Sequence, residues 1–141
     1  MIVQGQTTQF KLNLLKGLEN FAVGTPYTYK IALYTALADL NSQTTAYTTT
    51  NEVTGTGYTA GGKTLTVIPP DSNTTAQTAF VSFLPVTWTS SSFTTRGALI
   101  YNSTTGAAVC VLNFGSDKIT NSTFTITFPT ADATSAILRV S

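Results

Sequence analysis

Apolar and polar residues alternate along most of the chain. In Tyr27–Tyr34, tyrosine, isoleucine and leucine stand at every second position up to Leu33, with threonine, lysine and alanine between them. In Asn121–Phe128, threonine alternates with phenylalanine and isoleucine. A period of two indicates β-strands that bury one face.

Turn-forming residues separate about eight such segments at spacings of about 8–12 residues, which is typical of an antiparallel sandwich or barrel. The clearest hairpin signal is Ser103–Gly106, between an expected strand at Thr94–Asn102 and its partner at Ala107–Phe114. No helical segments stand between the strands, so a doubly wound α/β fold is not expected. The remaining expected strands lie near Leu65–Val67, Gln77–Phe83 and Ser135–Ser141, and Val86–Trp88 either continues the strand before it or forms a separate one.

One segment near the N-terminus has a helical period instead. Apolar residues recur at helical spacing between Thr8 and Phe21, and Thr7 or Thr8 is suited to cap the helix. Gly17 lowers the helix propensity by about 1 kcal/mol relative to alanine. We expect one short helix that packs over the end or side of a sheet.

These patterns predict an all-β fold, an antiparallel β-sandwich or jelly-roll-like barrel with one short N-terminal helix. Residues 1–9 form an expected N-terminal arm, and residues 10–141 form a single β-sandwich domain. The arm is polar with an apolar tip, Ile2-Val3, and is either a frayed terminus or a strand donated to a partner sheet. Jelly-roll and immunoglobulin-like arrangements both stay open, because spacing does not reveal strand order.

Composition favours a subunit of an assembly. The 141 residues have the length of one domain, and only 9% of them are charged, against about 25% in typical domains. Thirty threonines and 11 serines give the chain its polarity instead. A surface solvated by hydroxyl groups suits tight protein–protein contact, because few ions lose their water there. The same surface guards strand edges poorly against pairing with other chains.

Missing residue types exclude several kinds of chemistry. With no histidine and one cysteine, Cys110, the chain lacks the usual ligand sets for zinc, copper or haem and the residues of a Ser-His-Asp or Cys-His site. A net charge of +1 without basic clusters gives no footprint for nucleic acid. No apolar stretch approaches the ~20 residues that span a bilayer, and no signal peptide is visible. We expect no cofactor, nucleic-acid partner or membrane partner, and synthesis in a cytoplasm.

Two patterns that suggest enzymes have simpler explanations. Gly57–Thr64 matches the P-loop pattern, but the residues after it read as a strand ending in prolines, whereas a phosphate site needs a helix N-terminus. Most carboxylates adjoin turn residues, which favours turn and capping roles over paired-carboxylate hydrolysis. These carboxylates are Glu19, Asp39, Glu52, Asp71, Asp117 and Asp132. We therefore expect no enzymatic activity.

Aromatic residues offer a second kind of candidate site. Trp88 and Phe93 flank a Thr/Ser run, where core packing is the default role and a carbohydrate platform that includes Tyr58 is the alternative. Cys110 stands at an inward position of its expected strand and is predicted to be a small buried apolar residue.

Four residues are candidates for partner binding. Ile2 and Val3 form the tip of the expected arm. Arg96 lies just inside a strand and is suited either to a structural ion pair or to a subunit contact. Arg139 alternates with leucine and valine, so it is predicted to face solvent or a neighbouring subunit.

Several blocks of the sequence resemble a family of small virion structural proteins of tailed bacteriophages. The resemblance runs from about residue 10 to the end of the chain. Its blocks are Phe10–Gly17, Tyr29–Thr35, Glu52–Gly62, Arg96–Asn102 and Thr123–Pro129.

That resemblance implies a structural role without a catalytic motif. The role that fits best is a capsid decoration (cement) protein, made in the host cytoplasm, that binds the major capsid protein on the capsid exterior. A symmetric homo-oligomer, such as a trimer on local three-fold axes, agrees with this role. The alternative is a tail, neck or fibre component with a receptor- or carbohydrate-binding role.

Overall fold

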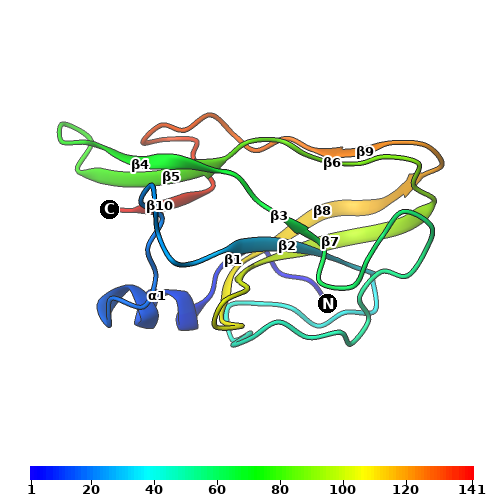
Figure 1. Ribbon diagram of the computed structural model, residues 1–141. Coiled ribbons are helices and arrows are strands. Elements are labelled where there is room, and N and C mark those ends of the chain that lie inside the picture. Colours follow the sequence, from blue (N-terminus) through cyan, green and yellow to red (C-terminus); the bar gives the residue numbers. More distant parts are fainter.

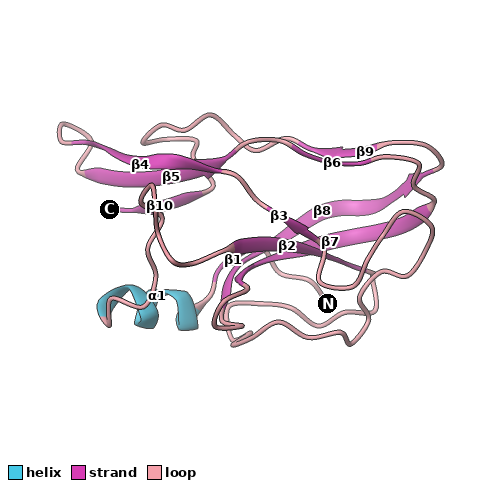
Figure 2. Ribbon diagram, in the orientation of Figure 1, coloured by secondary structure: helices cyan, strands magenta, loops and turns pink.

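The computed structural model describes residues 1–141 and contains one helix and ten strands (Figures 1 and 2). In chain order they are β1 (Gly5–Gln6), α1 (Thr8–Leu15), β2 (Tyr29–Tyr34), β3 (Lys63–Thr64), β4 (Val67–Asn73), β5 (Thr78–Phe83), β6 (Val86–Trp88), β7 (Phe93–Asn102), β8 (Ala108–Thr120), β9 (Phe124–Ile126) and β10 (Leu138–Val140).

The strands form three antiparallel sheets. The largest has the order β1-β8-β7-β2-β3, the second has the order β10-β5-β4, and β6 pairs with β9 in the third. In Figure 1 the two smaller sheets follow one another above the large sheet. The expectation of a mostly β, antiparallel chain with one helix is thus confirmed, whereas closure into a barrel is not seen.

Both faces of the large sheet are buried. Ile31 and Leu33 of β2 point into a core of twenty buried residues beneath the smaller sheets. Ala32 and Tyr34 point to the opposite face, into a second cluster that includes Leu40 from the segment after β2. That segment runs below the sheet in Figure 1 and covers it as a layer without regular structure. Central strands buried on both faces explain why β2 and β7 are rich in apolar residues.

Helix α1 is shorter than its apolar period predicts. Thr7 caps it as expected, since its hydroxyl oxygen accepts a hydrogen bond from the backbone N–H of Phe10 at 3.0 Å. The helix ends at Leu15 because Gly17 follows with φ +70°, a left-handed geometry that stops helices. Phe21 therefore lies outside the helix, where its ring stacks on that of Tyr29 with 4.3 Å between centroids.

Two turns anticipated from glycine positions are present. Residues 103–105 form the turn of the β7–β8 hairpin, which confirms that prediction, and Gly106 closes it by donating its N–H to the Asn102 carbonyl at 2.7 Å. The glycine-rich segment that matches the P-loop pattern is an irregular loop that leads into β3. A strand, not a helix N-terminus, therefore follows Gly62.

The first nine residues lie within the fold, where we expected a separate arm. Ile2 is only 5% exposed and forms a parallel bridge with Leu40. Gln6 lies in β1, which pairs with β8, and the helix begins at Thr8. The physical reason is the space above Gly97, where the Ile2 side chain packs into the outer cluster of the large sheet.

Candidate functional site

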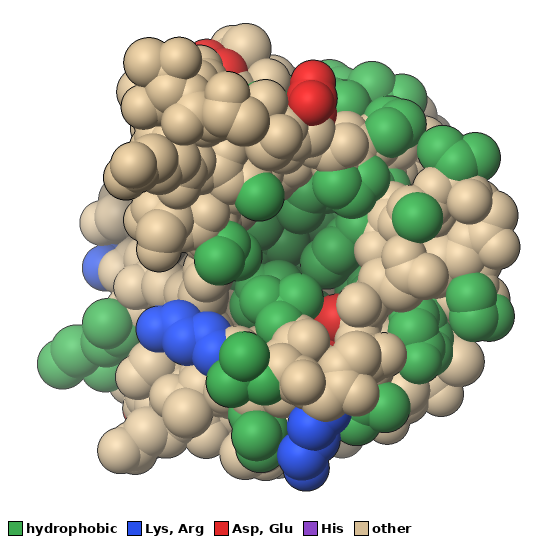
Figure 3. All heavy atoms as spheres, turned by 90° about the vertical axis from the view of Figure 1, so that its left-hand side faces the viewer, with side chains coloured by type: hydrophobic (Ala, Val, Ile, Leu, Met, Phe, Trp, Pro, Cys, Tyr) green, Lys and Arg blue, Asp and Glu red, His purple; other side chains and the backbone are tan.

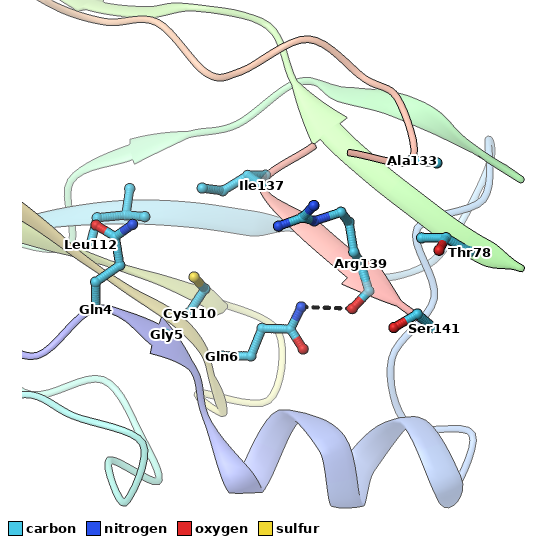
Figure 4. A pocket seen from close by; sticks show the side chains of 10 residues that line it. All are labelled: Gln4, Gly5, Gln6, Thr78, Cys110, Leu112, Ala133, Ile137, Arg139 and Ser141. Atoms are coloured by element: carbon cyan, nitrogen blue, oxygen red, sulfur yellow. Dashed lines mark hydrogen bonds between the residues drawn. The ribbon is translucent and has the colours of Figure 1, made fainter. Parts of the chain in front are cut away.

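Two open strand edges face each other at one end of the molecule. β1 pairs only with β8, and β10 pairs only with β5, so each has one unpaired edge. The Gln6 side-chain amide donates to the Arg139 carbonyl at 3.0 Å and links the two edges (Figure 4). A cavity of about 450 Å³ lies between them, which we call the β1/β10 seam. It is lined by Gln4, Gly5, Gln6, Thr78, Cys110, Leu112, Ala133, Ile137, Arg139 and Ser141.

Backbone groups of both strands point into the seam. The Thr7 N–H donates to the Val109 carbonyl at 2.9 Å, toward β8. Because main-chain groups of successive strand residues point to opposite sides, the N–H and C=O of Gln6 face the seam. On the other side, the Arg139 carbonyl accepts from Gln6, so the N–H of Arg139 also faces the seam. The seam thus presents main-chain donors and acceptors from two sheets.

Side chains give the seam an apolar floor and a polar rim. Cys110 and Leu112 belong to the inner core, and Ile137 packs against it. The Arg139 guanidinium is held by the Thr134 carbonyl, and its side chain extends over the cavity in Figure 4. Burial raises the pKa of the Cys110 thiol to about 12, so the sulfur stays protonated and is a poor nucleophile.

An apolar hollow of about 120 Å³ lies next to the seam, beside α1. Figure 3 views this end of the molecule and shows hydrophobic side chains around a depression. Residues of the helix region and of strands β5 and β10 line it: Phe10, Leu14, Phe21, Pro70, Ala79, Phe80, Val81, Leu138 and Val140. Leu138 and Val140 continue the same strand that borders the seam. The hollow therefore offers space for an apolar side chain beside an open strand edge.

The four predicted partner-binding residues fall in two places. Ile2 is buried, so it does not present an apolar tip, while Val3 is 48% exposed. Arg96 forms an ion pair with Asp117, with 3.7 Å between Nη1 and Oδ1, and lines a hollow of about 370 Å³ together with Ile2. Arg139 lies apart from them, in the seam.

The aromatic residues proposed for carbohydrate binding are not an exposed platform. Trp88 is 1% exposed and Phe93 is also buried, as core packing predicts. The Tyr58 ring packs against both of them, with centroid separations of 6.3 Å and 5.8 Å. Inward packing of all three rings leaves no flat aromatic surface for a sugar at this place.

Glu52 is a buried carboxylate that the sequence interpretation assigned to turns. Its carboxylate accepts hydrogen bonds from the hydroxyls of Tyr47 and Tyr58, each at 2.6 Å, and from the Gly61 N–H at 2.8 Å. Burial and the bond to Glu52 raise the pKa of Tyr58 well above its usual value. This cluster fastens the irregular layer to the large sheet, since Tyr58 also accepts the N–H of Leu33.

Glu19 is a second carboxylate that the same interpretation missed. It accepts hydrogen bonds from the Tyr29 hydroxyl at 2.7 Å and from the Asn102 side chain at 3.2 Å. Burial raises its pKa, and these hydrogen bonds oppose the rise. The turn interpretation does hold for Asp132, which accepts the N–H groups of Thr134 and Ser135. The tyrosine partners of Glu52 lie 5 and 6 positions away, and that of Glu19 lies 10 positions away. These residues stand in irregular segments or connect one to a strand, so the two-residue alternation does not reveal either buried carboxylate.

Metal-ligating side chains are dispersed through the fold. No three histidine, cysteine, aspartate or glutamate side chains lie close enough together to hold a metal ion, and every buried side-chain N or O atom has a hydrogen-bond partner. The single helix, α1, is not long and apolar enough to cross a membrane. Comparison with protein-family models, curated proteins and solved structures finds no match.

Proposed function

We propose that this protein is a virion structural protein of a tailed bacteriophage, a decoration protein that binds the major capsid protein on the outside of the shell. The resemblance of the five sequence blocks supports the virion assignment. We also take the strand arrangement as an open antiparallel β-sandwich, because the two smaller sheets cover one face of the large sheet in Figure 1.

The observation that carries the proposal is the unpaired edges of β1 and β10, which lie in a surface with few charges. The seam offers main-chain hydrogen bonds and lies beside an apolar hollow. With 9% charged residues, the surrounding surface loses little ionic hydration when another protein covers it. These are properties of a protein that holds other proteins together.

Attachment by several copies would strengthen a modest contact. Large apolar side chains are exposed at Leu15, Val23, Leu37 and Ile119, away from both core clusters. A symmetric oligomer, such as a trimer, covers some of these side chains and presents several seams to the shell. Linked contacts of this kind raise avidity by about 10²–10⁴ without new interactions.

Copy number in purified virions tests the proposal. Quantitative mass spectrometry against the major capsid protein is expected to give near-stoichiometric abundance. About a dozen copies per particle would overturn the capsid role and favour the tail, neck or fibres, where receptor binding becomes the candidate role. Absence from the virion would overturn the virion assignment itself.

A further inference from the structure

We propose that the β1/β10 seam takes up an extended segment of the capsid protein as an added β-strand. This inference rests on the proposed function and names the part of the partner that is bound. The occupant is a main-chain strand of about three residues, because β10 offers three residues as a template. Strand addition of this kind draws its affinity from main-chain hydrogen bonds and its selectivity from alternate side chains.

The hydrogen bonds needed for an added strand are already oriented. Gln6 and Arg139 direct their main-chain groups into the seam from opposite sides. The Gln6 side-chain amide donates a hydrogen bond to the Arg139 carbonyl. A main-chain N–H of an added strand would donate to the same oxygen. A side-chain amide is a replaceable partner, since it can rotate away without breaking either sheet. The Arg139 carbonyl therefore has a hydrogen-bond partner in the free protein and can exchange it when a strand arrives.

The other outer edges of the two larger sheets carry features that discourage pairing. The outer edge of the three-stranded sheet is β4, which contains Pro69 and Pro70. The opposite edge of the large sheet is β3, with two residues, one of them Lys63. The part of β8 beyond β1 carries Asp117 and Lys118. Within these two sheets, β1 and β10 contain neither proline nor an acidic residue, and Arg139 is the one charged residue among them. Their edges are therefore receptive to an added strand.

Side chains around the seam indicate which segment fits. A strand in the seam places one side chain over the apolar floor made by Cys110 and Leu112. Its neighbour along the strand points outward, toward the rim. A further hollow of about 460 Å³ adjoins the rim and is lined by both Lys11 and Arg139. The complementary occupant is an extended segment with an apolar residue next to an acidic residue and without proline.

Hydrogen exchange on capsids tests this placement. Empty capsids of the phage that encodes the protein are saturated with it, and amide exchange is compared between bound and free protein. We expect peptides that cover residues 5–7 and 138–141 to exchange at least about tenfold more slowly when bound. Protection confined to other segments would overturn the inference and leave capsid binding intact. Failure to bind capsids at all would overturn the proposed function.

A matched pair of variants separates main-chain pairing from charge. Arg139→Pro removes the N–H that faces the seam, whereas Arg139→Ala keeps it and removes only the guanidinium. We expect capsid affinity to fall by more than about tenfold in the proline variant and by less than about threefold in the alanine variant. Equal losses would overturn the inference. If the proline variant does not fold, as judged by circular dichroism, the exchange experiment decides.

A second copy of the chain is the competing occupant. Seam protection that appears in free protein as its concentration rises, without capsids, would show that copies pair through this edge. That outcome would overturn the inference, because the seam would already be filled when the oligomer meets the shell.

Discussion

Two glutamates are stabilised inside this protein by tyrosine hydroxyls and amides, without a neighbouring cation. Glu52 accepts hydrogen bonds from the hydroxyls of Tyr47 and Tyr58, and Glu19 accepts one from the hydroxyl of Tyr29. Hydrogen bonds to a charged group contribute about 1.5–3 kcal/mol each, which offsets part of the desolvation of the carboxylate. Each cluster connects a segment without regular secondary structure to a strand of the large sheet through hydrogen bonds.

The raised pKa of Glu19 predicts a pH dependence of stability. The folded state holds its proton more tightly than the unfolded chain, whose value is 4.5. Its contribution to stability is therefore full below pH 4.5 and is lost as the pH rises through the folded pKa. Urea unfolding at several pH values between 4 and 7 is expected to show wild type gaining stability relative to Glu19→Gln as the pH falls.

Asp132 provides the control for that measurement. Hydrogen bonds from Thr134 and Ser135 lower its pKa below the usual 3.8. Its contribution is present above pH 3.8 and is lost only as the pH falls through the folded value, so the difference between wild type and Asp132→Asn is expected to stay constant between pH 4 and 7. A Glu19→Gln difference that is equally constant over this range, or that shrinks as the pH falls, would contradict the assignment.

At the scale of elements, the irregular layer is held against the large sheet by a close backbone approach. Gly62 has φ +75°, and a Cβ at this position would lie 1.7 Å from the Ile31 carbonyl oxygen and 2.8 Å from the Cα of Ala32. Only glycine allows the loop to reach β2 and begin β3 there. The glycines that suggested a phosphate loop thus serve the contact between a loop and a strand.

Gly62→Ala is expected to destabilise the protein by more than about 4 kcal/mol, since a left-handed residue and a backbone clash are combined. Gly106→Ala is the matched control, because Gly106 has φ +82° and open space around its Cα. The control is expected to lose about 1–2 kcal/mol. Thermal or urea unfolding of both variants measures the difference, and similar losses would show that the close approach does not govern stability.

At the scale of the whole molecule, the scarcity of charged residues limits the contribution of electrostatic attraction to any protein contact. The net charge is +1, and the ion pairs present are two exposed or half-exposed contacts, Met1–Asp39 and Arg96–Asp117. Such contacts contribute little and are screened by salt. The proposed binding to a capsid is therefore expected to depend on shape, apolar contact and main-chain hydrogen bonds.

If the proposed capsid binding is correct, this surface predicts that it is nearly insensitive to salt. Dissociation constants measured by cosedimentation are expected to change by less than about threefold between 0.05 and 0.5 M sodium chloride, since few charges take part. A control protein with a basic capsid-binding patch is expected to weaken strongly over the same range. A loss of tenfold or more for the present protein would mean that charges such as Arg139 and Lys11 dominate the contact.

Local residue patterns were sufficient to predict where strands and the helix lie. How these elements pair and pack depends on contacts that only the tertiary structure shows. The two-residue period, the Thr7 cap and the hairpin at Ser103–Gly106 depend on neighbours within a few positions, so the alternation of side chains reveals them. The same alternation does not reveal the pairing of β1 with β8, the burial of Glu52 or the seam. Ile2 accepts a hydrogen bond from Asn113, 111 positions away, and no local period encodes such a meeting.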